Sequence, residues 1–77
     1  MYIKSINVVE LCWAICIIKE KGIFIIGQLK EITIFRSDNY QCIQKINDAH
    51  SNEIYGIIEL KNGYILSFEK EIKIWSF

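Results

Sequence analysis

The sequence nearly repeats itself when it is aligned with its own copy at an offset of 40 residues. Residues 30–35 (KEITIF) match residues 70–75 (KEIKIW), and residues 2–7 (YIKSIN) match residues 42–47 (CIQKIN). A fixed period of this length marks a repeat architecture, in which each unit buries its apolar surface on its neighbours. A chain with two such units therefore has to fold as part of an array.

The composition points the same way. The chain has 77 residues, 52% of them hydrophobic, and no proline. A chain this short buries only a limited share of its surface. Much of its β-branched side-chain area is therefore expected to face further units or another chain.

Short apolar runs separated by polar turns are typical of antiparallel strands. Asn62-Gly63 is a strong hairpin signal because both residues tolerate a positive φ, and Gly22 can do the same in the first unit. The main competing prediction is a helix over residues 8–21, but β-branched and aromatic residues crowd the chain at the expense of helix formers. We predict eight strands: Tyr2–Asn7, Cys12–Ile18, Ile23–Gly27, Glu31–Phe35, Tyr40–Ile46, Ile54–Leu60, Tyr64–Phe68 and Glu71–Trp75.

The strands differ in how apolar they are. Residues 14–18 and 23–26 are apolar on both sides, so the sheet that holds them is expected to be covered on both faces. The strands at 2–7 and 40–46 carry more polar residues, which suits the outer edge of a sheet.

The second unit has His50 before its first strand, the Asn62-Gly63 hairpin, Ser67 in its second strand and Trp75 at the end of its third. In these features it resembles a WD repeat of the β-propeller family. The period of 40 and four strands per unit agree with that family. The resemblance implies an all-β fold of two antiparallel four-stranded blades, an incomplete and open propeller, with repeats at residues 1–37 and 38–77. Each unit would supply an outer strand and then three inner ones.

The resemblance also implies a hydrogen-bonded network across the second blade. In the family, the His, the Ser or Thr, the Trp and a turn Asp form this network; here His50, Ser67 and Trp75 match, and Glu69 stands near the Asp position. The first unit has Glu10 near the His position, Gly27 near the Ser and Phe35 in place of Trp. Phe35 is expected to be the packing equivalent of Trp75, and the first blade should hold only the hydrophobic part of the arrangement.

Several classes of function lack support in the sequence. Nine basic and nine acidic residues are scattered, so there is no basic patch for nucleic acid. The apolar run at residues 8–18 is too short to cross a bilayer. Three cysteines argue against a secreted disulfide framework and, with one histidine, against a zinc site. We expect no metal, no cofactor, no membrane association, and residence in the cytoplasm or nucleus.

The resemblance implies a non-catalytic scaffold that binds proteins or peptides through blade edges and end loops. Candidate contact loops are residues 19–22, 37–39 and 47–52. Two blades are too few to close a propeller, which leaves two explanations: the chain is a fragment of a longer propeller, or three or four copies close a ring as a homo-oligomer. A third hypothesis is a small enzyme that uses His50 or a cysteine, although no Gly-rich phosphate loop or paired catalytic carboxylates accompany them. Trp13 could belong to a binding site, but we assign it to packing between blades.

Overall fold

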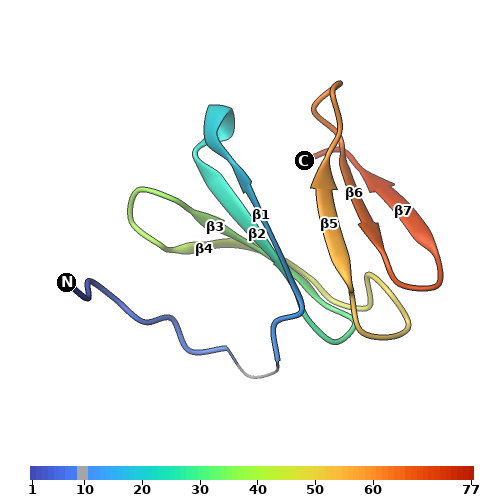
Figure 1. Cartoon of the computed structure of the whole chain (residues 1–77), viewed down its shortest axis with the longest axis horizontal. Helices are drawn as coiled ribbons and strands as arrows, with labels where there is room; N and C mark the ends of the chain where they lie inside the picture. The colour runs from blue at the N-terminus through green and yellow to red at the C-terminus, as the bar shows by residue number, and fades with distance from the viewer. Residues whose placement is uncertain (9–10) are drawn as a thin grey trace.

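The computed structural model describes residues 1–8 and 11–77 and shows an all-β protein (Figure 1). The described residues form two antiparallel sheets, of four and three strands. Seven of the eight predicted strands are present, with ends shifted by at most two residues. The elements are β1 (Ala14–Ile18), the 3-10 helix η1 (Lys19–Lys21), β2 (Ile23–Gly27), β3 (Ile32–Arg36), β4 (Cys42–Ile46), β5 (Gly56–Glu59), β6 (Ile65–Phe68) and β7 (Ile72–Trp75).

The first sheet has the strand order β1-β2-β3-β4. Gly22, at φ 64°, ends η1 in the left-handed conformation and returns the chain into β2. The polar strand β4 lies at the edge, as its composition predicts, and most of its residues are exposed. Because β4 belongs to residues 38–77, the second sequence unit contributes the outer strand of the first sheet.

The predicted strand Tyr2–Asn7 is wrong for the chain by itself, since these residues are extended but unpaired. The equivalent segment of the second unit, β4, already pairs with β3. A strand needs a free partner edge, and nothing in the described part of the chain pairs with residues 2–7.

The second sheet has the order β5-β6-β7, so the expectation of four strands in each sheet fails here. Its β5–β6 hairpin turns through Gly63 at φ 86°. Within the described residues, β7 pairs with β6 alone. One edge of β7 therefore carries backbone groups with no strand beside them.

The strand pairing shows which residues of the two sheets are equivalent, and the offset between them is not 40 in every strand. Ile15, Ile26 and Thr33 lie side by side in the first sheet, and Ile57, Ser67 and Lys73 lie side by side in the second. The equivalent third strands keep the offset of 40, but each hairpin of the second sheet is one residue shorter. Ile26 therefore matches Ser67, and Gly27, which the sequence placed near that position, is the next residue along β2.

The two sheets pack face to face and approach most closely between β1 and β5 (Figure 1). The first sheet contributes the face that carries Ile18, Ile25 and Ile34, and the second contributes the face that carries Ile57 and Ile65. Gly27 lies in this interface, where a Cβ atom would come within 2.8 Å of Ile54 Cγ2. A larger residue at 27 would push the two sheets apart.

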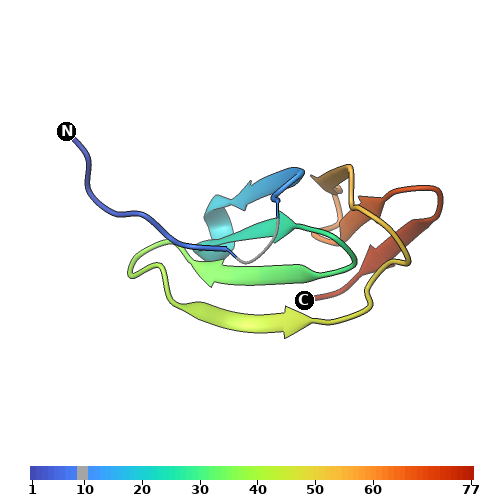
Figure 2. The ribbon, with the colours of Figure 1, turned by 90° about the horizontal axis from the view of Figure 1, so that it is seen from below.

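The chain crosses between the sheets through residues 47–55, and its N-terminal segment projects away from them (Figures 1 and 2). The competing helix over residues 8–21 is wrong: its described part contains β1 and only the three-residue η1. In residues 1–8 and 11–77 no helix has the length and apolarity needed to span a bilayer.

Candidate functional site

Four side chains from the second sequence unit meet in a continuous chain of hydrogen bonds. Trp75 Nε1 donates to Ser67 Oγ over 2.8 Å. Ser67 Oγ lies 2.6 Å from His50 Nε2, and His50 Nδ1 lies 3.4 Å from Glu69 Oε1. The structure thus brings together all four residues that the resemblance placed in a network, including Glu69 where the family has Asp.

The chemistry of the acceptor atoms determines which atom donates the proton in each of these hydrogen bonds. The Glu69 carboxylate can only accept, so the bond to it requires a proton on His50 Nδ1. With a neutral imidazole, His50 Nε2 is then an acceptor, and it takes the Ser67 hydroxyl proton. Ser67 Oγ in turn accepts from Trp75, so every bond in the chain has one donor and one acceptor.

Glu69 is the charged end of this chain, and it lies at the β6–β7 turn. The backbone N–H of Glu71 donates to Glu69 Oε1 over 3.1 Å. Backbone donors at Lys70 and Glu71, together with His50, lower the pKa of the Glu69 carboxyl from its ordinary value. The carboxylate is therefore held in its ionised form, which suits an acceptor of the imidazole N–H.

The segment that carries His50 is anchored on the first sheet. The carbonyl of Lys30, in the β2–β3 turn, accepts from the backbone N–H groups of Ala49 and His50 at 2.8 and 3.3 Å. The N–H of Lys30 donates to the Asn52 carbonyl over 3.2 Å, and Ile54 donates to Gln28 over 3.1 Å. The backbone of His50 is thus held by the first sheet while its side chain is bonded to the second.

The order Ser67–His50–Glu69 has the same groups as a hydrolytic triad, namely a hydroxyl, an imidazole and a carboxylate. Burial argues against that chemistry. Ser67 has 0% and His50 has 2% of its surface exposed, so a substrate has no path to the hydroxyl. The hydroxyl oxygen also accepts the Trp75 N–H, which engages one of the two lone pairs with which it could attack a substrate.

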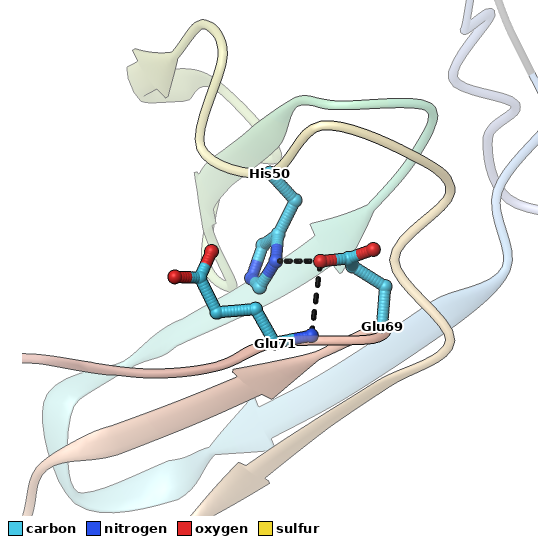
Figure 3. Close-up of side chains that lie close together, drawn as sticks. All are labelled: His50, Glu69 and Glu71. Atoms are coloured by element: carbon cyan, nitrogen blue, oxygen red, sulfur yellow. Dashed lines mark hydrogen bonds and ion pairs between the residues drawn. The ribbon is translucent and has the colours of Figure 1, made fainter.

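His50, Glu69 and Glu71 could also be considered as metal ligands, because one ligand atom from each lies within 4.8 Å of the others (Figure 3). Both ring nitrogens of His50 are already in hydrogen bonds, to Ser67 and to Glu69. A metal would have to displace one of them. The arrangement fits a hydrogen-bonded network better than a ligand set.

The first sheet carries no equivalent chain of polar side chains among its described residues. Phe35 is buried at the position of Trp75 and stacks on Phe24, with ring centroids 5.1 Å apart. Ile26 stands at the position of Ser67. Glu10, which the sequence places near the His position, lies outside the described residues.

A second buried polar pair was not found from the sequence. Thr33 Oγ1 donates to Gln28 Oε1 over 3.5 Å, and both side chains are buried. Gln28 holds, in the turn after β2, the place that Glu69 holds after β6. The signal that could have revealed the pair is a Thr among the apolar residues of β3 and a Gln directly after the apolar strand β2.

The other candidates lie apart from the network. Trp13 is half-exposed and meets the Tyr55 ring edge-on at 6.4 Å. The backbone of Trp13 bonds to Gly27 of the first sheet and that of Tyr55 to Phe68 of the second, so this contact lies between the two units, in keeping with the assignment of Trp13 to packing between blades. Cys12, Cys16 and Cys42 are free thiols. Burial raises the pKa of the Cys16 thiol, which disfavours the reactive thiolate. The described hydrogen bonds of His50 go to Ser67, Glu69 and Lys30, and none goes to the loops at residues 19–22 and 37–39.

Comparison of the chain with protein-family models, with curated proteins and with solved structures finds no match.

Proposed function

We propose that the chain is a non-catalytic scaffold module, a pair of WD-repeat-like β-propeller blades that binds other proteins or peptides. The observation that carries the proposal is the outward face of the second sheet. Ile58, Ile72 and Ile74 are exposed there at 51%, 66% and 59%, and Ile58 and Ile74 flank Leu66 in one row of the ladder. Exposed apolar rows of this kind mark surfaces that another protein covers.

The buried network supports a structural role for the polar residues. His50, Ser67, Glu69 and Trp75 satisfy one another's hydrogen bonds and join the β6–β7 hairpin to the segment anchored on the first sheet. Such a network fixes the orientation of the exposed face with respect to the rest of the molecule. It leaves the sheet faces, the strand edges and the end loops as the surfaces that remain for binding.

The balanced charge also favours a protein partner over nucleic acid, since the basic residues are scattered along the sequence and nine acidic residues offset them. Three free cysteines are in keeping with a reducing compartment, and we extend the proposal to the cytoplasm or nucleus.

Affinity purification with quantitative mass spectrometry tests the proposal. Tagged wild-type protein is compared with the double variant Ile58→Lys, Ile74→Lys and with Gln44→Lys, a matched charge change on the exposed edge strand β4. We expect a set of proteins that the wild type and Gln44→Lys retain and the double variant loses at least tenfold. Equal recovery by all three proteins, or a wild type that retains no protein at all, untagged copies of the same chain included, would contradict the proposal.

The enzymatic alternative is tested by His50→Ala in a hydrolase substrate screen. If the wild type shows a turnover that His50→Ala abolishes while circular dichroism shows an intact fold, the scaffold proposal is wrong. A lower melting temperature without any activity in the wild type supports the structural role.

A further inference from the structure

We infer that the partner of the exposed second sheet is a second copy of this chain, whose residues 2–7 add a fourth strand to β7. The inference rests on the proposed function and names the partner of that same surface. It joins two features left unpaired in the described part of the chain, the free edge of β7 and the extended residues 2–7.

The chain already contains one example of the same contact. Strand β4 pairs with the edge of β3, and residues 42–47 (CIQKIN) match residues 2–7 (YIKSIN) at the offset of 40. Strand β7 keeps the same offset from β3 in the structure. A segment equivalent to β4 and an edge equivalent to β3 are therefore both present and both unused.

The register of the existing contact predicts the register of the new one. Ile46 pairs with Ile32, so Ile6 would pair with Ile72. Lys45 pairs with Thr33, which places Ser5 opposite Lys73, and Gln44 pairs with Ile34, which places Lys4 opposite Ile74. No like charges come directly opposite each other, and the apolar pair Ile6–Ile72 extends the row in which Ile72 lies beside Phe68.

The sheet faces agree with this geometry. Inside one chain, the first sheet packs its Ile25 face against the Ile65 face of the second. The two remaining faces are the Ile72 face of the second sheet and the Phe35 face of the first, where Ile15 and Ile17 are exposed at 60% and 63%. A neighbour that offers its Ile72 face to this Phe35 face repeats the packing found within the chain.

The N-terminal segment leaves the first sheet on the side where that neighbour would lie. Ile6 lines shallow hollows together with Phe24 in one and with Ile26 and Phe35 in another, all on the face described above. Residues 2–7 are exposed, and their N-terminal end projects away from both sheets (Figures 1 and 2). They can therefore pair with a neighbour's β7 without any change in the sheets.

The contact is heterologous, because it joins two different surfaces, and it can be repeated from copy to copy. If the rotation between copies closes, the product is a ring; if it does not, the product is an open chain of copies. Both products grow through the same junction, so a variant that destroys either half of the junction should leave monomers.

The decisive experiment is a complementation test by size-exclusion chromatography with multi-angle light scattering. One variant, Lys4→Pro with Ser5→Pro, removes two adjacent N–H donors from the donated segment without touching a strand of either sheet. The other, Ile72→Lys with Ile74→Lys, disrupts the acceptor face. The matched control is Lys4→Ala with Ser5→Ala, which keeps the backbone donors.

We expect the wild type and the alanine control to form assemblies at micromolar concentration. Each of the two disrupted variants should run as a monomer of 9.1 kDa. Their equimolar mixture contains one intact donor and one intact acceptor, so it should form a dimer of twice that mass and nothing larger. A symmetric interface would not be rescued in this way.

A wild type that stays monomeric, a proline variant that assembles like the wild type, or a mixture that stays monomeric would each overturn the inference. These outcomes are separable from failure of the proposed function. If the affinity purification retains other proteins on the Ile58 and Ile74 face while the wild type is monomeric, the scaffold proposal stands and the partner is not a second copy.

Discussion

The two sheets solve the same packing problem with different chemistry. At the end of its third strand the first sheet has Phe35 stacked on Phe24, and the second has Trp75 bonded to Ser67. On the neighbouring strand, β2 in the first sheet and β6 in the second, Ile26 stands at the position of Ser67. At these positions the first sheet makes apolar contacts, with the Thr33–Gln28 pair beside them, whereas the second has a directional chain of hydrogen bonds through four side chains.

The difference follows from what covers each sheet. The network of the second sheet lies on the face toward the first sheet, where His50 arrives on a segment fixed by the Lys30 carbonyl. The Phe35 face of the first sheet has no second sheet over it in the described chain. An apolar face is the surface that a neighbour can cover without having to satisfy buried polar groups.

The largest difference between the two sheets should come from Phe35→Ala, which removes the aromatic contact of the first sheet. Phe35 is buried and its ring stacks on Phe24, so the variant loses apolar burial and leaves a cavity. We expect the free energy of unfolding in urea to fall by about 3–5 kcal/mol. Phe35→Trp keeps an aromatic ring and serves as the control; a loss below about 1 kcal/mol for Phe35→Ala would show that this sheet does not depend on the stack.

The next effect is expected in the second sheet from Ser67→Ala. The variant removes the atom that bonds both His50 and Trp75, and it leaves a buried imidazole nitrogen without a partner. We expect urea unfolding to report a loss of about 2–4 kcal/mol, since an unsatisfied buried group costs more than its bond contributes. Ser51→Ala makes the same chemical change at an exposed position and should cost almost nothing; equal losses would mean that the network adds no stability.

A smaller effect is expected from Trp75→Phe, which makes the second sheet resemble the first at this position. Phe keeps most of the ring and its stacking on Phe77, whose centroid lies 6.0 Å away, but it loses the Nε1 donor. Trp75 is only partly buried, so the loss should be about 1–2 kcal/mol in the same unfolding measurement. A double-mutant cycle with Ser67→Ala should show coupling, because both variants remove the same bond; additive losses would contradict it.

Much of the fold could be predicted from the sequence because the period of two in the apolar pattern and the turn residues act locally. The Asn62-Gly63 hairpin and the polar edge strand at residues 42–46 are examples. The strand at residues 2–7 failed because pairing depends on a partner edge, which no local pattern reports. The sequence placed Gly27 only near the Ser67 position, and the residue that matches Ser67 is Ile26. Each hairpin of the second sheet is one residue shorter, and sequence alignment at a constant offset cannot register that change.

The site was predictable in its members but not in its geometry. The types and spacing of His50, Ser67 and Trp75 resemble a known family pattern, whereas the use of Glu69 depends on a turn whose backbone N–H groups hold the carboxylate. The anchoring of residues 49–54 on Lys30 and Gln28 depends on backbone groups, which carry no signal in the sequence.

The smallest expected effect is a pH dependence that only the second sheet should show. Backbone donors at Lys70 and Glu71 and the His50 ring lower the pKa of Glu69 in the folded state, so the unfolded chain binds the proton more readily. The stabilisation should be complete above the ordinary Glu pKa of about 4.3 and should be lost as the pH falls through the lowered pKa of Glu69.

The variant Glu69→Gln tests this pH dependence, because it retains a carbonyl acceptor for His50 Nδ1–H but has no carboxyl to titrate. Melting temperatures between pH 7 and pH 3 should therefore fall less steeply in Glu69→Gln than in the wild type, whereas the exposed control Glu20→Gln should follow the wild type. Parallel curves for Glu69→Gln and the wild type would show that the ionised carboxylate does not stabilise the network, and that the two sheets differ only in their neutral hydrogen bonds.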